Sequence, residues 1–471
     1  MRTVSTICFL LLMGLTACTS TYKAPDLGGL YNSLVQNESP YRNPVVVIPG
    51  LMGSRLVEAQ SHSVVWGAFG SGSVNPNSIH GAQLIGLPMA KGGKLNQLKD
   101  DIIPAGALDR AIISLFGYPL ELNTYAYILG VLGVGGYRDQ HLGEAGIVDY
   151  GDRHFTCFQF AYDWRRDIVE SAKALDRFLK EKRKYVQQEI EKRFGIKDYD
   201  VKFDLVAHSI GGLVARYYLR YGTADLPEHG DLPKLTWAGS RYTEHLVMIG
   251  TPNAGSIDAL TNMVNGYRPA FLLSRYPSAV LGTMPSVYQL LSRSRHHPLL
   301  DENRLPVNDI LDPELWEKNG WGLADPNQAH VLKLMLPKIK SPEQRRQIAL
   351  DHLRKCLKRA KHFAAAMDIP AKPPGSVKYF LVAGDSDKTN KTAQFDSFGR
   401  LAIVEKGPGD GVVLRQSALM DERLEGNLTE RLISPISWDQ VLFLFSDHLD
   451  LTRNPAFTDN LLYFLMESQR S

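Results

Sequence analysis

The segment Val206-Ala207-His208-Ser209-Ile210-Gly211-Gly212 lies between a strand pattern and a helix pattern. Residues 201–207 form a short apolar run typical of a buried strand, and residues 211–221 have the apolar spacing of an amphipathic helix. A serine on so tight a turn needs small residues two positions before and two positions after it, and Ala207 and Gly211 meet this need. The segment therefore predicts a nucleophile elbow with Ser209 as the nucleophile, at a helix N-terminus that faces developing negative charge.

Short apolar runs alternate with helical patterns along the rest of the chain. Two amphipathic helices are predicted over residues 167–194 and 211–221. Strands alternating with helices predict an α/β fold with a mostly parallel central sheet covered on both faces. The strand candidates are residues 44–48, 154–162, 201–207, 245–249, 377–383 and 401–404.

Two long segments interrupt this alternation. Residues 256–374 contain helical pieces and no convincing strand, so we expect a helical cap inserted between core strands. Residues 56–140 form a second excursion with apolar, glycine-rich pieces at 82–89 and 126–136, one of which is a candidate lid or membrane-facing loop. The predicted core is then split into residues 44–255 and residues 375–471.

The composition is that of an ordinary globular protein. The chain has 471 residues, of which 44% are hydrophobic and 22% charged, and its formal net charge is +3. So small a charge gives no argument for nucleic-acid binding, and the apolar content excludes a disordered chain. We expect no nucleic-acid partner and no cofactor.

The first residues have the pattern of a secretory leader. Arg2 precedes an apolar run over residues 7–15, which is too short to span a bilayer. Leu15-Thr16-Ala17-Cys18 resembles the lipobox of bacterial lipoproteins, which implies a signal peptide over 1–17 and acyl chains on Cys18, followed by a polar linker up to residue 43. Thr19 favours an outer-membrane anchor facing the periplasm or the cell surface. A plain signal peptide or a short membrane anchor is the alternative.

A serine nucleophile needs a base, and the base needs an orienting acid. His448 lies after every strand candidate, where the last loop of such a sheet delivers the base. Two turns offer the acid: Asp385 ends a strand pattern, and Asp410 lies between glycines in Gly409-Asp410-Gly411. Spacing in the sequence does not choose between Asp385 and Asp410 as the acid. Asp385 and Asp387 form a pair of carboxylates without further ligands, and we predict no metal.

The oxyanion of the reaction needs two backbone donors. Ile210, directly after the nucleophile, is one. The loop Pro49-Gly50-Leu51-Met52-Gly53-Ser54 follows an early strand, and its glycines allow close backbone approach, so we expect Leu51 to supply the second N–H.

Together these motifs resemble the lecithin:cholesterol acyltransferase family of α/β-hydrolases, which includes lysosomal phospholipases. The resemblance rests on residues 49–54, Tyr162-Asp163-Trp164-Arg165, residues 207–212, Gly409-Asp410-Gly411-Val412-Val413 and His448, in the family's order. It implies an α/β-hydrolase fold with Ser209 as nucleophile, Asp410 as acid, His448 as base, and Leu51 with Ile210 as oxyanion hole. Residues 249–256 resemble a lipase loop that shapes the edge of the site.

The expected function is a serine esterase or acyltransferase acting on lipid acyl esters at a membrane surface. A carboxylesterase, triacylglycerol lipase, thioesterase or peptidase with the same triad is the first alternative, and a non-catalytic lipid-binding envelope protein is the second. Water or an alcohol could accept the acyl group.

Three further features leave alternatives open. Cys157 and Cys356 are either disulfide-bonded or two buried thiols. The basic amphipathic pattern over residues 345–361 indicates either a lipid-facing helix or a solvated face. Asp163-Trp164-Arg165 is equally well explained as a structural ion pair.

Overall fold

A computed structural model describes the chain over residues 35, 39–68, 74–107, 111–115, 118–122, 125–228, 231–269, 274–423 and 430–467. The leader over 1–17, Cys18 and most of the linker lie outside these residues. None of the helices in the described ranges has both the length and the apolar character needed to cross a bilayer.

A six-stranded sheet forms the centre of the molecule. The spatial order is β14-β11-β9-β8-β1-β7, and every neighbouring pair is parallel. Its strands are β1 (Val45–Ile48), β7 (Cys157–Gln159), β8 (Phe203–His208), β9 (Thr243–Ile249), β11 (Lys378–Gly384) and β14 (Gln440–Leu444). The chain moves outward from β1 in both directions, so the sheet has a topological switch point between β1 and β8. Ligands of open α/β sheets bind at the carboxyl ends of the strands at such a point.

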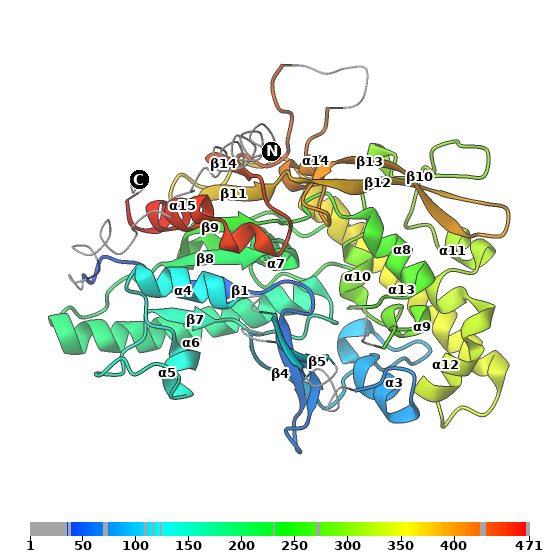
Figure 1. Ribbon diagram of the computed structural model, residues 1–471, viewed down its shortest axis with the longest axis horizontal. Coiled ribbons are helices and arrows are strands. Elements are labelled where there is room, and N and C mark those ends of the chain that lie inside the picture. Colours follow the sequence, from blue (N-terminus) through cyan, green and yellow to red (C-terminus); the bar gives the residue numbers. More distant parts are fainter. Residues whose placement is uncertain are drawn as a thin grey trace, which may run out of the picture.

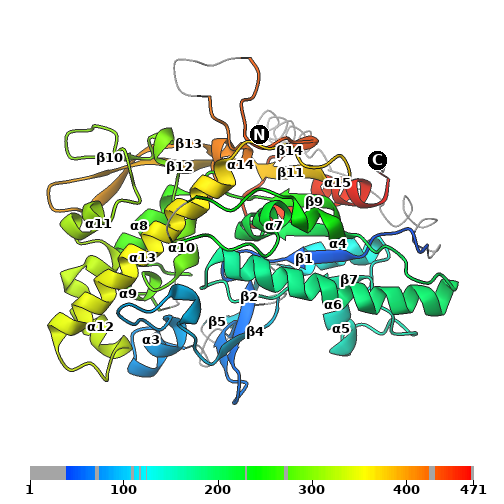
Figure 2. The same ribbon diagram turned by 180° about the vertical axis from the view of Figure 1, so that it is seen from behind.

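Helices cover both faces of the sheet, as the alternation of patterns predicts. Helices α4 (Ala126–Val134) and α15 (Pro455–Met466) lie on the face seen in Figure 1, and α6 (Ile168–Phe194) and α7 (Ile210–Tyr221) lie on the face seen in Figure 2. In β1, Val45 and Val47 contribute to the core beneath α4, whereas Val46 and Ile48 contribute to the larger core on the opposite face.

The long helix α6 is set by its two ends. The Asp167 side chain accepts the N–H of Val169, and Gly195 ends the helix in the left-handed region with φ 70°. Asp at the N-cap and Gly at the C-cap are the residue types that satisfy the backbone N–H and carbonyl groups left without partners at helix ends. The observed helix confirms the amphipathic pattern to within one residue.

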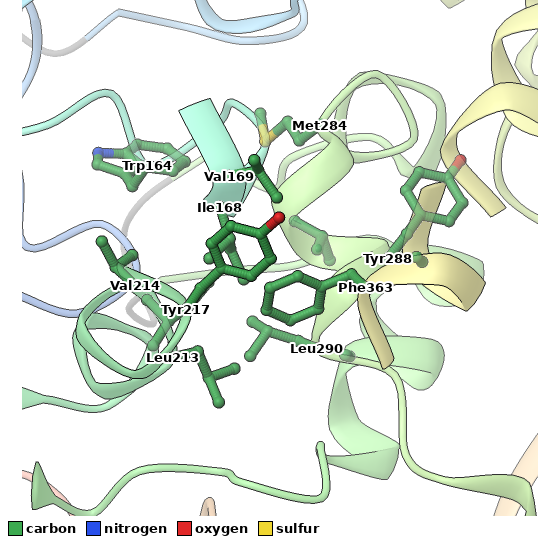
Figure 3. Close-up of a cluster of buried hydrophobic side chains, with 14 of the residues drawn as sticks. Trp164, Ile168, Val169, Leu213, Val214, Tyr217, Met284, Tyr288, Leu290 and Phe363 are labelled. Atoms are coloured by element: carbon green, nitrogen blue, oxygen red, sulfur yellow. The ribbon is translucent and has the colours of Figure 1, made fainter. Parts of the chain in front are cut away.

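The larger core continues into the inserted segment. Figure 3 shows Tyr217 of α7 beside Phe363 of α13 (Pro342–Asp368), with Ile168, Leu213 and Leu290 around them. The Tyr217 and Phe363 rings stack at 5.8 Å between centroids, and both side chains are fully buried. Truncating a buried aromatic side chain of this kind costs about 3–5 kcal/mol, so α13 is an integral part of the core.

Helices dominate residues 256–374, which gather to one side of the sheet (right in Figure 1). The strand β10 (Leu299–Leu300) corrects the expectation that this segment has none, because it pairs with an outlying hairpin. Besides α13, the segment contains α8 (Ile257–Asn265), α9 (Ser278–Leu281), α10 (Pro285–Gln289), η3 (Ser294–His296), α11 (Pro313–Asn319), η4 (Gly322–Ala324), η5 (Pro326–Gln328) and α12 (Ala329–Met335). The domain boundaries stay a prediction.

The predicted strand at residues 401–404 exists but is not part of the central sheet. It begins β13 (Leu401–Gly409), which pairs antiparallel with β12 (Asp387–Phe395). The run of polar residues in β12 has no apolar pattern to reveal it. Strand β14 was not among the predicted strands, although residues 441–444 are an apolar run. Together β12 and β13 form a hairpin inserted between the end of β11 and Asp410.

Residues 56–140 form small outlying elements, and the lid-like role of this excursion stays a prediction. Four apolar side chains of α4, those of Ile128, Leu129, Val131 and Leu132, are buried in the core that α15 shares. Helix α3 packs on α12, where the Gln83 side chain donates to the carbonyl of Leu334 at 2.9 Å. The elements are β2 (Ser54–Glu58), β3 (Val64–Trp66), α3 (Ile79–Ile85), η1 (Leu95–Gln97), β4 (Ile102–Ala107), β5 (Ala111–Leu115) and β6 (Tyr118–Leu122), in addition to α4.

The remaining elements are short. Cys157, in β7, and Cys356, in α13, are both free and buried, which decides between the two alternatives for these residues. The remaining helical elements are α5 (Gln140–Glu144), η2 (Ala238–Tyr242), α14 (Arg415–Leu419) and η6 (Asp450–Arg453).

Candidate active site

Ser209 lies on a strained turn between β8 and α7. Its φ is 53° and its ψ −128°, a conformation that costs a non-glycine residue about 1–3 kcal/mol. The N–H of Ser209 donates to the carbonyl of Ile249 at 2.8 Å, and its carbonyl accepts from Gly212 at 3.0 Å. The neighbouring strand and the first turn of α7 therefore hold Ser209 in the conformation expected of an elbow.

The small residues around Ser209 are required by close backbone contacts. A Cβ on Gly211 would lie 2.6 Å from the carbonyl oxygens of Ile48 and Pro49, and a Cβ on Gly50 would lie 2.8 Å from the Cβ of Ser209. These distances are too short for any side chain. The elbow is thus pressed against the end of β1, which is why both loops are rich in glycine.

His448 and Asp410 are in direct contact. The Nδ1 of His448 lies 2.8 Å from Oδ2 of Asp410, and both side chains are buried. The other carboxylate oxygen of Asp410 accepts the N–H groups of Val412 at 3.0 Å and Val413 at 2.6 Å. The N–H of His448 also donates to the carbonyl of Asp410 at 2.9 Å. The carboxylate is therefore fixed by its own loop, with one oxygen left for the imidazole.

The second acid candidate, Asp385, has a different partner. Its carboxylate is paired with Arg415 at 2.7 Å, and the contact with His448 is made by Asp410. Asp410 still lies at the end of β11, because a Cβ on Gly384 would come within 2.5 Å of its Cβ. The β12–β13 insertion leaves this strand end and returns to it, so the acid occupies the expected place in space although it comes later in the sequence.

The loop at residues 249–256 lies at the edge of the site, as the resemblance implied. Gly250 has φ 55°, and a Cβ there would lie 3.0 Å from the imidazole ring of His448. Deeper in this loop, the Asn253 side chain accepts from the buried Arg216 and donates to the carbonyl of Ala418. This loop therefore provides the space for the base and ties itself to α7.

The expected oxyanion donors occupy two adjoining turns. The N–H of Gly53 donates to the carbonyl of Gly50 at 3.0 Å, which closes a turn with Leu51 and Met52 at its centre, and Met52 has φ 60°. Ile210 is the first residue of α7. The N–H groups in the first turn of a helix have no partner within the helix, and the role of Leu51 and Ile210 as oxyanion donors stays a prediction.

Three buried side chains lie behind these turns, and no role in the site was predicted for any of them from the sequence. Tyr125 and Tyr162 contact the loop that carries Leu51, and His208 lies between Tyr125 and His448. Burial lowers the pKa of His208 to about 3, with the nearby His448 as a second cause. Tyr125 precedes α4 in the 56–140 excursion, and no motif in the sequence marks it.

Asp163-Trp164-Arg165 is a structural motif. Arg165 is fully buried and pairs with Asp163 at 2.7 Å and with Asp100 at 2.9 Å. It also donates to the carbonyl of Leu84, at the end of α3. The guanidinium therefore fastens the excursion to the central sheet.

The basic pattern at residues 345–361 belongs to α13, whose apolar face is in the core. Arg354 pairs with Glu317, Arg359 with Asp167, and Lys361 with Asp309. These ion pairs argue against a lipid-facing role. In the described part of the chain, no group of three or more His, Cys, Asp or Glu residues is arranged to hold a metal ion.

Comparisons with known proteins extend this description. Residues 140–294 match the family model of lecithin:cholesterol acyltransferase, a segment that contains Ser209 and Ile210 but ends before Asp410 and His448. No curated protein sequence matches the chain.

Solved structures give a likeness of fold. A chain in the crystal structure of the Tle4–Tli4 complex is 14% identical, with 90% of this chain and 98% of that chain covered and a TM-score of 0.52. The mature form of Bacillus licheniformis lipase BlEst2 is 14% identical over 92% of this chain and 95% of its own, with a TM-score of 0.31. Lipase 1 from Pelosinus fermentans is 14% identical over 91% and 99%, with a TM-score of 0.32. Residues 140–294 are thus similar to the lecithin:cholesterol acyltransferase family, and they form part of an α/β-hydrolase fold.

Proposed function

We propose that this protein is a serine esterase that acts on lipid acyl esters through Ser209, His448 and Asp410. The observation that carries the proposal is the buried contact between His448 Nδ1 and Asp410 Oδ2 at 2.8 Å, at the sheet edge where Ser209 lies on its strained turn. A carboxylate at Nδ1 holds the proton there and leaves Nε2 free to accept one. Such an arrangement is what an otherwise weak serine nucleophile requires.

In the first half-reaction, Ser209 Oγ attacks the ester carbonyl carbon while Nε2 of His448 takes its proton. The carbonyl oxygen becomes an oxyanion, which the N–H groups of Leu51 and Ile210 stabilise. The tetrahedral intermediate then collapses. The bond to the alcohol breaks, His448 returns the proton to the departing oxygen, and the acyl group stays on Ser209 as an ester.

In the second half-reaction, water or another alcohol attacks the acyl-enzyme with His448 again acting as base. Water releases a fatty acid, and an alcohol gives a new ester. Both outcomes use the same residues, so the chemistry of Ser209 does not choose between them.

Exposed apolar side chains close in sequence to His448 and Asp410 support a lipid substrate. Phe445 is 86% exposed and Leu449 56% exposed, and they flank His448 in sequence; Val412, 44% exposed, lies two residues after Asp410. A contiguous exposed apolar patch is typical of a binding surface for apolar ligands, and these residues are our candidates for such a patch. The family of residues 140–294 supports the same class of substrate.

The test is mass spectrometry of lipids after the protein has been incubated with phosphatidylcholine vesicles, with and without cholesterol, beside a Ser209→Ala control. We expect products only with the serine enzyme. Fatty acid and lysolipid would identify a phospholipase, and cholesteryl ester an acyltransferase. Cleavage of a water-soluble p-nitrophenyl ester without any lipid product would contradict the lipid substrate. The absence of every product would contradict the esterase.

We also propose that Cys18 carries acyl chains that hold the protein at the outer membrane. The sequence of residues 15–18 supports this, and several acyl chains on one residue anchor a protein stably. A Cys18→Ser variant should leave the membrane fraction and lose the lipid mass from its N-terminal peptide. Unchanged sedimentation of the variant would refute the anchor.

A further inference from the structure

Two buried tyrosine hydroxyls contact a single peptide group in the loop that carries Leu51. The hydroxyl of Tyr125 accepts the N–H of Gly50 at 2.7 Å, and the hydroxyl of Tyr162 donates to the carbonyl of Pro49 at 2.8 Å. This N–H and this carbonyl belong to the same planar peptide, Pro49–Gly50, and in a trans peptide they point in opposite directions. Rotation of this peptide would break both hydrogen bonds.

The two tyrosines reach the peptide from opposite faces of the central sheet. Tyr125 belongs to the core beneath α4, and Tyr162 to the larger core beneath α6 and α7. Both side chains are buried, and burial raises the pKa of each phenol. Each hydroxyl therefore keeps its proton at neutral pH.

The position of Tyr125 leaves little freedom. A Cβ on Gly53 would lie 2.5 Å from its hydroxyl oxygen, and a Cβ on Gly50 would lie 3.3 Å from it. The glycines of the loop thus make room for the phenol as well as for the nucleophile. The hydroxyl lies against the turn whose central residues are Leu51 and Met52.

His208 fixes the direction of the Tyr125 hydroxyl. Its Nε2 faces the carbonyl of His448 at 3.4 Å, and its Nδ1 faces the Tyr125 hydroxyl at 3.1 Å. A carbonyl can only accept, so Nε2 must carry the proton of a neutral ring. Nδ1 then has a lone pair and accepts the O–H of Tyr125. The hydrogen bonds run in one direction, from Gly50 through Tyr125 and His208 to the backbone of His448.

We propose that Tyr125 and Tyr162 are positioning residues that hold the Pro49–Gly50 peptide, and with it the N–H of Leu51, in the orientation that stabilises the oxyanion. This inference rests on the proposed function. Neither tyrosine touches the reacting atoms. Each acts through the backbone that precedes Leu51, and His208 connects that backbone to the loop of the catalytic base.

The kinetic test uses Tyr125→Phe and Tyr162→Phe, which remove one hydroxyl each and keep the ring. Tyr288→Phe is the matched control, because Tyr288 is also fully buried and its hydroxyl also donates to a carbonyl, that of Gly282 at 2.9 Å, inside the cap. Loss of one oxyanion donor costs about 10²–10³-fold in rate, so a misdirected donor should lower kcat about 10- to 100-fold.

The expected pattern separates positioning from stability. In both site variants kcat on a p-nitrophenyl ester should fall while KM stays near the wild-type value. Affinity for a boronic acid, which forms a tetrahedral anion on Ser209, should weaken by a similar factor. Tyr288→Phe should change thermal stability and leave kcat and the boronic-acid affinity unchanged. Equal kcat and equal affinity in all three variants would overturn the proposal.

A second measurement does not depend on activity. Nitrogen-15 NMR of the histidine rings, with His208→Gln used to assign the His208 signals, should show a protonated Nε2 and an unprotonated Nδ1 in His208. Tyr125→Phe should shift the Nδ1 resonance. A proton on Nδ1 of His208 would overturn the hydrogen-bond direction. If the wild-type chain hydrolysed no ester while these NMR signals held, the proposed function would fail and the peptide-holding contacts would stand.

Discussion

At the carboxyl edge of the central sheet, the turns around Ser209 are joined mainly by hydrogen bonds between neutral groups. The 56–140 excursion is instead joined to the sheet by buried ion pairs. Gly50, Tyr125 and His208 exemplify the first kind of contact, and Arg165 with Asp163 and Asp100 the second. A site that handles a developing anion is best surrounded by fixed dipoles, since stray full charges would compete for that anion. Substitutions in the two regions should therefore separate into losses of rate and losses of stability.

The largest effect is expected from Ser209→Ala. Removing the nucleophile should lower ester turnover by about 10⁴-fold or more, with only the oxyanion donors and substrate binding left. The hydrogen bonds that hold the elbow are made by the backbone of Ser209 and remain in the variant, so the temperature of thermal unfolding should be nearly unchanged. Steady-state kinetics and a melting curve check both statements. Residual turnover near the wild-type rate would refute the role of Ser209.

Asp410→Asn and Asp385→Asn form a matched pair, since both residues lie at the end of β11. In Asp410→Asn the amide presents a donor to Nδ1 of His448, which favours the tautomer that cannot accept the serine proton. We expect kcat to fall about 10³- to 10⁴-fold.

Asp385→Asn should change kcat less than about 2-fold, because this carboxylate pairs with Arg415 and an exposed pair contributes at most about 1 kcal/mol. Circular dichroism of both variants controls for misfolding. Equal losses of rate in the two variants would mean that the site has no single acid.

Arg165→Met addresses the attachment of the excursion. The substitution leaves the carboxylates of Asp163 and Asp100 without their cation, and breaking a buried pair costs about 3–5 kcal/mol. The unfolding free energy from a denaturant titration should fall by this amount, while kcat of the folded fraction stays within a few-fold of wild type. A large loss of kcat with unchanged stability would show that the motif serves the reaction directly.

The smallest effect is expected on the pH dependence of the unfolding free energy, from the ion pair of Glu422 with Arg295. Hydrogen bonds from Arg295 and His296 outweigh the cost of burial and lower the pKa of Glu422 to about 2. Its unfolded pKa is about 4.3, so its contribution is complete above pH 5 and is lost as the pH falls toward 2.

Since the pair is only half buried, solvent screening reduces that contribution to about 1 kcal/mol. Glu422→Gln should therefore make the loss of unfolding free energy between pH 5 and pH 3 less steep than in wild type. Identical pH profiles for the two proteins would show that the pair contributes nothing.

The sequence predicted the elements that depend on local pattern. The elbow, α6 and the four inner strands of the sheet follow from apolar runs and small residues, and His448 follows from its place after the last predicted strand. Small residues at 207 and 211 are informative because the turn excludes larger ones for steric reasons.

What the sequence left open depends on contacts between distant segments. Spacing could not choose between Asp385 and Asp410, because the β12–β13 insertion has no apolar pattern and hides the return of the chain to the end of β11. Tyr125 was not predicted, since a single tyrosine gains its role only when the excursion folds back on Gly50. The basic pattern of α13 resembles a lipid-binding face, but Arg354, Arg359 and Lys361 form ion pairs.

The most direct test of the central claim is peptide-mapping mass spectrometry after treatment of the protein with a fluorophosphonate. We predict one phosphonyl group, on Ser209, with labelling slowed at least 10²-fold in His448→Ala because general-base catalysis of this size is lost. Labelling of a different residue, or labelling of Ser209 at the same rate with and without His448, would contradict the claim that these residues form one catalytic unit.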